Sequence, residues 1–240
     1  MRLITWNCCS GPWPKKLEAL ESLEGDLTVI PECPRIRGAR GAQGTTVWTG
    51  TNPRKGLGVI ARAPWQVRRL RSPRQLPKYV VPVAVSGPVS FLLLAIWAQK
   101  DPVAPYVRGL HRAVTACRGL IERQPTVLLG DFNSNAIWDH EHPSDLSHSA
   151  LVRKLGALGL VSAYHSRNKE AHGSETRPTF YLYRHATRPY HIDYCFVPAA
   201  WAGRLREVNI GGHTEWAGRS DHMPLVVDVE VAEVGDGGPA

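Results

Sequence analysis

Short apolar runs with the composition of β-strands recur along most of the chain. They are rich in Val, Ile, Thr, Tyr, Phe and Trp, the residues that pack well on a pleated surface. We expect strands at residues 2–7, 26–30, 45–50, 57–62, 79–85, 90–98, 125–130, 179–184, 190–197 and 222–231. Strands therefore dominate the expected secondary structure.

A few stretches instead show apolar residues at helical spacing, at residues 14–23, 106–123 and 147–158. In each, the apolar positions recur every three or four residues and so share one face of a helix. Together with the strands, these stretches predict an α/β fold in which two β-sheets form a sandwich with helices outside. We expect one domain over residues 1–232 and a flexible Gly-rich tail over residues 233–240.

Composition adds size, charge and compartment to this picture. With 240 residues, 43% of them hydrophobic, the chain can bury a substantial core. Its 29 Lys and Arg residues exceed its 21 Asp and Glu residues, and the net charge of +8 favours polyanionic partners. The five cysteines include no metal-type pair, which indicates reduced thiols and a cytoplasmic protein. We find no targeting segment, expect no membrane span and expect a monomer.

Polar residues follow the apolar run at residues 126–130, where the sequence reads GDFN. Alternate residues of a strand share a face, so Asp131 and Asn133 are expected on the same side. A turn that uses these residues to satisfy free backbone groups would look the same. Similar residues end or begin other strands, however: Asn7, Glu32, Asp193, and the pair Asp221 and His222. This recurrence favours a functional site at one edge of the sheets.

The residue types at these strand ends favour one class of ion. An acidic residue such as Asp193, within an apolar strand, is costly unless a cation or hydrogen bonds compensate its charge. Carboxylate and amide oxygens are hard ligands that suit Mg²⁺, Mn²⁺ or Ca²⁺, whereas zinc prefers His and Cys. The pattern therefore indicates a divalent-metal-dependent phosphoester hydrolase.

The order of these motifs resembles a known group of enzymes. RLITWN, VIPE, LLGDFN, HIDY and SDH follow one another as in the exonuclease–endonuclease–phosphatase superfamily, and the resemblance covers residues 2 to about 229. That superfamily includes exonuclease III, pancreatic deoxyribonuclease, inositol polyphosphate 5-phosphatases and sphingomyelinases. The resemblance implies a four-layered α/β sandwich of two mixed sheets, with the site at one rim.

The resemblance also implies ligands for a Mg²⁺ or Mn²⁺ cofactor. Glu32 would be the principal metal ligand, with Asn7 beside it and Asp221 or Asp193 nearby. The family usually has Gln before this glutamate, whereas this chain has Pro31. A contact that supports the metal ligand is therefore missing or replaced.

Catalytic roles follow from the same resemblance. His222 would donate to the scissile phosphate, with its ring oriented by Asp193 or Asp221. Asp131 would position or deprotonate the attacking water, and Asn133 would hold a phosphate oxygen.

The family often has a further Tyr or His before the GDFN strand. The candidates here are Trp97, Tyr106 and His111, of which we select Tyr106. As an alternative, Tyr106 caps the helix that follows it.

Arginines and aromatic residues alternate between residues 176 and 194, a mixture that can grip phosphates and stack on bases. We expect substrate contacts from Arg177, Arg184, His191 and Trp138. Aromatic residues of an ordinary hairpin would show the same alternation, and His191 could equally face the other side of its strand.

Histidines also cluster after the GDFN loop, at His140, His142 and His148. A second metal site or a substrate-binding wall would use them, but their spacing follows no standard zinc pattern, which favours a solvated loop.

The sequence leaves the substrate open. The net charge favours a nuclease that acts on DNA, including abasic or single-stranded DNA. Basic residues that could line a backbone groove are Arg35, Arg37, Arg40, Arg54, Lys55, Arg68, Arg69, Arg71 and Arg74. The first alternative is a phosphatase or phosphodiesterase for a small phosphate ester or lipid headgroup. The second is a catalytically silent binding module, which would not need so many polar groups at strand ends.

Overall fold

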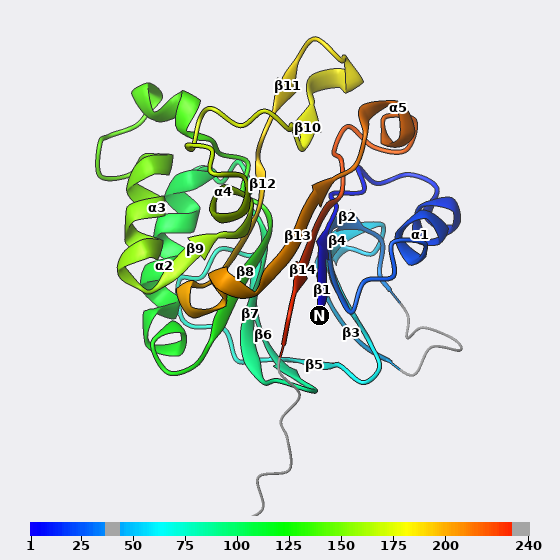
Figure 1. Cartoon of the computed structure of the whole chain (residues 1–240), viewed down its shortest axis with the longest axis horizontal. Coiled ribbons are helices and arrows are strands. Elements are labelled where there is room, and N and C mark those ends of the chain that lie inside the picture. Colours follow the sequence, from blue (N-terminus) through cyan, green and yellow to red (C-terminus); the bar gives the residue numbers. More distant parts are fainter. Residues whose placement is uncertain (37–43, 232–240) are drawn as a thin grey trace, which may run out of the picture.

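The computed structural model describes residues 1–36 and 44–231, which form two six-stranded sheets packed face to face (Figure 1). The first sheet has the order β13 (Leu205–Ile210), β14 (Leu225–Val229), β1 (Arg2–Thr5), β2 (Leu27–Cys33), β4 (Lys55–Arg62) and β3 (Gly44–Asn52). The second has the order β5 (Gln66–Arg69), β6 (Val80–Ser86), β7 (Phe91–Trp97), β8 (Thr126–Asp131), β12 (Asp193–Pro198) and β9 (Leu160–Ser162). Both sheets are mixed, because β1 pairs with β2 and β7 with β8 in parallel.

Helices lie outside the two sheets. Figure 1 shows α1 (Trp13–Glu21) outside the first sheet, and α2 (Val107–Ile121) and α3 (His148–Ala157) outside the second. The remaining short elements are α4 (Ala163–Asn168), α5 (His213–Trp216), the 3-10 helices η1 (Ala136–Glu141), η2 (Leu182–Arg184) and η3 (Ala199–Arg204), and the hairpin of β10 (Phe180–Tyr181) and β11 (Pro189–Tyr190). The predicted α/β sandwich with outer helices is therefore confirmed.

The main core fills the space between the sheets. Leu3 and Val29 of the first sheet and Leu93 and Leu129 of the second belong to one fully buried cluster. A second cluster joins α2 to the other face of the second sheet, where Leu110 and Val114 of the helix meet Leu94 and Leu128. Each of these buried side chains stabilises the fold by about 1.5–3 kcal/mol relative to an exposed one. Because β8 contributes to both clusters, its end is rigidly held.

A glycine lets β8 approach its neighbour closely just before the strand ends. Gly130 has a φ of +147°, and a Cβ atom there would lie 1.9 Å from the Ile96 carbonyl oxygen of β7. Only glycine fits such a position. Asp131 follows at once, so this close approach fixes where its side chain leaves the sheet.

Most expected strands and all three expected helices are present, with shifted ends. The run at residues 179–184 is corrected: only Phe180–Tyr181 is a strand, and Tyr183 and Arg184 then turn the chain with φ values of 55° and 62°. Three strands that the residue pattern does not predict are also present: β5, β9 and β13. The expected tail at residues 233–240 and the residues Arg37 and Arg40 lie outside the described residues. Within the described parts of the chain, no helix has the length and apolarity needed to cross a membrane.

Candidate active site

Asp131 lies fully buried at the end of β8, surrounded by hydrogen-bond donors. Its Oδ1 accepts the Asn133 backbone amide at 2.8 Å, and its Oδ2 accepts Nδ2 of Asn7 and Nδ2 of Asn133, each at 3.0 Å. Burial raises the pKa of this carboxyl to about 7, and nearby Asp193 adds to the rise. His222 and the bonds from Asn7 and Asn133 act in the opposite direction. The predicted proximity of Asp131 and Asn133 is therefore present, and the carboxyl can take up a proton near neutral pH.

Asp193 and His222 form a buried pair beside Asp131. Asp193 lies directly opposite Asp131 in the β8–β12 ladder, and the Thr179 hydroxyl oxygen accepts its backbone amide at 3.0 Å. His222 Nδ1 donates to Asp193 Oδ2 at 2.8 Å, while its Nε2 lies 4.0 Å from Asp131 Oδ2. Asp193 is therefore the carboxylate that orients His222, one of the two candidates that the sequence left open.

The two carboxylates determine the charge of His222. Burial opposes a charged ring, but the Coulomb attraction and hydrogen bond of Asp193 outweigh it, and Asp131 adds to them. Together they raise the pKa of His222 to about 9. The ring is therefore a cation at neutral pH, with Nε2 directed toward Asp131. We call Asp193, His222 and Asp131 the catalytic row.

Backbone contacts hold His222 in place. The Ser220 hydroxyl donates to the Asn7 carbonyl at 2.7 Å and accepts the His222 amide at 3.0 Å. The Trp6 indole donates to the His222 carbonyl at 2.8 Å. The end of β1 and the segment before β14 therefore form one connected rim.

Glu32 lies near the end of β2 with its side chain 19% exposed. Its φ of 63° is left-handed, and the β2–β4 register shifts between Pro31 and Cys33. Lys55 Nζ lies 2.9 Å from Glu32 Oε2 and 5.4 Å from the centre of the Trp97 ring. The bulge at Pro31 thus turns the carboxylate out of the strand, where a lysine meets it.

Asp221 shares its surroundings with Glu32. Burial raises the pKa of the Cys9 thiol, and Asp221 and Glu32 both add to this rise because both carboxylates lie near the thiol. The Arg184 side chain is also close enough to hydrogen-bond to Cys9 and oppose the rise. Asp221 and Arg184 therefore lie beside Cys9, and Glu32 is near enough for its charge to act on the thiol.

The residues at this rim fit a hard divalent cation. Glu32 and Asp221 supply carboxylate oxygens, and Asn7 can supply its Oδ1, which already accepts the Cys9 amide at 3.0 Å. Lys55 holds a positive charge against Glu32, as expected where a carboxylate needs a counter-charge. Such an all-oxygen donor set suits Mg²⁺ or Mn²⁺.

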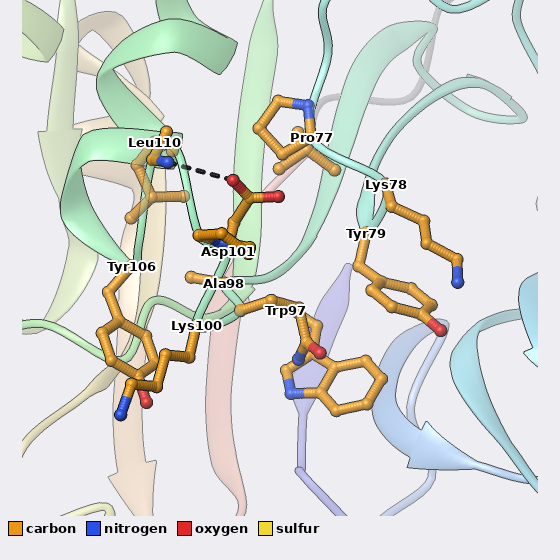
Figure 2. A pocket seen from close by; sticks show the side chains of 14 residues that line it. Pro77, Lys78, Tyr79, Trp97, Ala98, Lys100, Asp101, Tyr106 and Leu110 are labelled. Atoms are coloured by element: carbon orange, nitrogen blue, oxygen red, sulfur yellow. Dashed lines mark hydrogen bonds between the residues drawn. The ribbon is translucent and has the colours of Figure 1, made fainter.

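A pocket of about 300 Å³ lies at the end of β7 and the start of α2 (Figure 2). Its wall includes Trp97, which is the register partner of Asp131, and Ala98, whose carbonyl accepts Asn133 Nδ2 at 3.0 Å. Figure 2 shows Tyr79 and Trp97 on one side and Lys100 and Tyr106 on the other. Tyr106, the tyrosine selected from the sequence, lines this pocket with its side chain partly exposed.

The other two candidates for that role differ from Tyr106. Trp97 also lines the pocket. His111 is buried between α2 and α3, where its Nε2 lies 3.0 Å from the Ser147 carbonyl.

The residues expected to contact substrate differ in their surroundings. The Arg177 guanidinium donates to the Ile210 carbonyl at 3.0 Å, and His191 is only 3% exposed with its Nδ1 donating to the Arg177 carbonyl. The structure therefore does not bring the His191 ring to the rim; the residue lies in the short link between β11 and β12, with its ring packed against Tyr164.

Trp138, by contrast, begins a line of aromatic rings. Its ring centre lies 5.2 Å from that of Tyr190, Tyr190 lies 6.2 Å from Phe180, and Phe180 lies 4.7 Å from His222. This line leads from η1 across the β10–β11 hairpin to the catalytic row.

Several contributors could not be found from the sequence. Thr179 supports the row through its hydroxyl, which accepts the Asp193 backbone amide, and no residue pattern reveals that contact. Lys55 was noted for its charge, but its pairing with Glu32 depends on the β2–β4 register. Lys78 and Lys100, at the pocket, had no motif around them.

The chain belongs to the Endonuclease/Exonuclease/phosphatase family, whose sequence model matches residues 4–222. The resemblance noted from the motifs is therefore confirmed. No curated protein matches the chain.

Solved structures with a similar fold include three nucleic-acid enzymes. A variant of the 3′ phosphatase NExo from Neisseria, bound to a product DNA hairpin, is 23% identical with a TM-score of 0.71, covering 96% of this chain and 100% of that one. An AP endonuclease from Archaeoglobus fulgidus is 17% identical with a TM-score of 0.68, covering 96% and 100%. The endonuclease domain of the telomere-specific retrotransposon TRAS1 is 16% identical with a TM-score of 0.68, covering 96% and 98%. At these identities the likeness shows the fold.

Proposed function

We propose that the protein is a divalent-metal-dependent nuclease that hydrolyses phosphodiester bonds of DNA. The observation that carries this proposal is the catalytic row, in which the His222 ring lies between Asp193 and Asp131. The DNA assignment is supported by the net charge of +8 and by the similar structures, one of which holds a DNA hairpin. Abasic or single-stranded DNA is within this class of substrate.

Asp131 is the group that activates water in this proposal. Its pKa near 7 lets the ionised carboxylate accept a proton at neutral pH, which is where a general base works best. The water oxygen forms a bond to phosphorus, its proton passes to Asp131, and the bond between phosphorus and the leaving oxygen breaks. Asn133 and Asn7 hold the carboxylate by hydrogen bonds during this step. The contact to a phosphate oxygen expected of Asn133 would require Nδ2 to release one of its two present acceptors, Asp131 Oδ2 or the Ala98 carbonyl.

His222 stabilises the negative charge that grows on the phosphate. Asp193 keeps the ring protonated and fixes its orientation, so that Nε2–H can donate toward the rim. A fixed charged donor of this kind needs no reorganisation as the reaction proceeds. Tyr106 is proposed as a further contact to the reacting phosphate, from the pocket side.

Glu32, Asn7 and Asp221 would hold the Mg²⁺ or Mn²⁺ ion. When bound, the ion would polarise a phosphate oxygen and offset developing charge. Lys55 Nζ lies 2.9 Å from the Glu32 carboxylate, so Lys55 and the ion would compete for it, and Lys55 must move away or share it when the ion binds.

The strand of DNA is proposed to cross the rim between two groups of side chains. Arg184 and the aromatic line of Trp138, Tyr190 and Phe180 form one side. The pocket of Tyr106 with Lys78 and Lys100 forms the other. Aromatic faces stack on bases without sequence preference, and cations contact the backbone. Arg177 would contribute through long-range charge, since its guanidinium is bonded to Ile210.

The test is hydrolysis of end-labelled single-stranded DNA, duplex DNA, abasic duplex, 3′-phosphorylated DNA and RNA, each with Mg²⁺, Mn²⁺ or EDTA. We expect metal-dependent cleavage of at least one DNA substrate that is lost in Glu32→Ala and His222→Ala. Matched Glu18→Ala, a change at an exposed position of α1, should retain it. No cleavage of any nucleic acid by folded, metal-loaded protein would refute the proposal.

The pocket supports a second candidate, a phosphatase for a small phosphate ester. About 300 Å³ with two lysines at its wall could enclose a small phosphorylated molecule. Salt separates the two: DNA binding weakens steeply as salt rises, because counterions are released, whereas binding of one small ester does not.

A further inference from the structure

A group of imidazoles and one carboxylate gathers around α3 and α4, separate from the catalytic row. We call His148, His165, His172 and Glu175 the histidine cluster. His148 begins α3, His165 lies in α4, and the other two lie in the loop before β10. No role in the proposed chemistry requires these side chains.

The distances in the histidine cluster are those of a metal-binding group. One ligand atom from each of His165, His172 and Glu175 lies within 4.8 Å of the other two. His165 Nε2 is 3.0 Å from Glu175 Oε1. Tetrahedral zinc, with ligand bonds of about 2.0–2.1 Å, places its ligand atoms about 3.4 Å apart. The ligand atoms are therefore close to the required spacing, and the widest pair must approach by no more than about 1.4 Å. Because the His165 and His172 rings stack with their centres 3.5 Å apart, one ring must also rotate before both lone pairs reach the same ion.

Further hydrogen bonds orient each member from behind. His165 Nδ1 lies 2.7 Å from the Ser162 hydroxyl, and Glu175 Oε2 accepts Nδ2 of Asn135 and the Gly173 amide, each at 3.1 Å. His172 Nδ1 lies 3.3 Å from His148 Nε2. Supporting contacts of this kind fix ring orientation in natural metal sites.

The histidine cluster also has the charge that a cation would need. The Glu175 side chain is only 4% exposed, and its carboxylate accepts hydrogen bonds from Asn135 and the Gly173 amide and lies 3.0 Å from His165 Nε2. Beside them, His191 is 3% exposed, and its Nε2 has no hydrogen-bond partner among the described residues. A buried carboxylate among imidazoles, with a nitrogen left unpaired nearby, favours a bound cation.

We propose that His165, His172 and Glu175 bind one divalent ion of the zinc class, with a water as the fourth ligand. Imidazole nitrogens favour zinc over Mg²⁺, which prefers oxygen ligands. The site differs from the grouping of His140, His142 and His148 considered from the sequence, since the His140 side chain is 75% exposed. This zinc site goes beyond the proposed nuclease function, and its test does not depend on that function.

A bound ion would strengthen the wall of the active site. The loop that carries His172 and Glu175 runs on to Thr179, which accepts the Asp193 amide, and to Phe180, which forms a β-bridge with His222. Fixing this loop to α4 would therefore steady the hairpin over the catalytic row. The proposed ion would therefore stabilise the structure and take no part in the reaction.

The test measures zinc affinity of the untagged protein, stripped with a chelator and then titrated with Zn²⁺ against a competing indicator in excess Mg²⁺. The Mg²⁺ occupies the oxygen ligands around Glu32, so that only a nitrogen-containing site reports. We expect wild type, Glu32→Gln and His140→Ala to bind one equivalent of Zn²⁺. His172→Ala and Glu175→Gln should bind at least about tenfold more weakly. Zinc should also raise the melting temperature of wild type more than that of these two variants.

Two results would overturn the proposal: no zinc bound by wild type, or zinc binding that is lost in Glu32→Gln but kept in His172→Ala. If the cluster variants do not fold, the visible spectrum of Co²⁺-loaded wild type decides. Intense bands of four-coordinate cobalt would support the site, and the weak bands of six-coordinate cobalt would contradict it.

Discussion

Replacing Asp193 by Asn should make the activity depend on pH in a new way. The hydrogen bond of 2.8 Å and the charge of Asp193 raise the pKa of His222 from 6.5 to about 9 against the opposing effect of burial. That rise corresponds to about 3 kcal/mol. Asn keeps the shape and an acceptor oxygen but removes the charge, so the pKa of His222 should return to 6.5 or below.

The size of the effect follows from the fraction of charged His222. With a pKa of about 9, roughly nine tenths of the rings are protonated at pH 8; with a pKa of 6.5, only about 3% are. The rate in Asp193→Asn should therefore fall about 30-fold relative to wild type at pH 8. At pH 6, below a pKa of 6.5, most His222 rings are protonated in both proteins, so the deficit should be much smaller.

The assay is kcat/KM for DNA cleavage between about pH 5.5 and 9.5 at saturating Mg²⁺. Wild type should rise through about pH 7, as Asp131 ionises, and fall through about pH 9, as His222 loses its proton. In Asp193→Asn both limbs should move to lower pH, because Asp193 also raises the pKa of Asp131. The matched control is Asp228→Asn, which breaks a surface ion pair with Arg2. A deficit of equal size at every pH would refute this reasoning.

Three further changes have defined outcomes. Lys55→Met should lower the Mg²⁺ concentration for half-maximal activity about two- to fivefold, because a partly exposed ion pair with Glu32 contributes about 0–1 kcal/mol. A Mg²⁺ titration measures this concentration. A higher Mg²⁺ requirement in the variant would contradict the idea that Lys55 and Mg²⁺ compete for Glu32. Gly130→Ala should destabilise the protein by about 2–5 kcal/mol in urea unfolding, since its Cβ would strike the Ile96 carbonyl, whereas Gly119→Ala, in a helix with open space, should be neutral or stabilising. Tyr106→Phe should lower kcat about tenfold or more with little change in DNA affinity, and an unchanged kcat would limit Tyr106 to lining the pocket.

The fold was predictable because its signals are local and repeated. The buried strands β7 and β8 are continuous apolar runs, and α2 shows its apolar face at every turn. The missed strands are different: β5 reads QVRR, and β13 reads LREVNI with exposed charged residues. Such edge strands owe their structure to the neighbour they pair with, which a local pattern does not reveal.

The active site, like the fold, could be predicted only in part from the sequence. Asp131, Asp193 and His222 could be proposed because polar residues are unusual at the ends of apolar strands. Their hydrogen bonds could not be derived, since residues 131, 193 and 222 meet only through the β8–β12 register and the packing of one sheet on the other. His191 shows the limit most clearly, because the sequence predicted a strand there, whereas the residue lies buried in the link between β11 and β12.

The most direct test of the account compares wild type with His222→Gln in two measurements on the same labelled DNA. One is the single-turnover cleavage rate at saturating Mg²⁺, and the other is the Kd for DNA with Ca²⁺ in place of Mg²⁺. We predict that Gln, which keeps polarity but not the charge, lowers the rate by about 10²–10⁴-fold and changes the Kd only a few-fold. Cleavage at the wild-type rate by His222→Gln would contradict the central claim that the row of Asp193, His222 and Asp131 performs the chemistry.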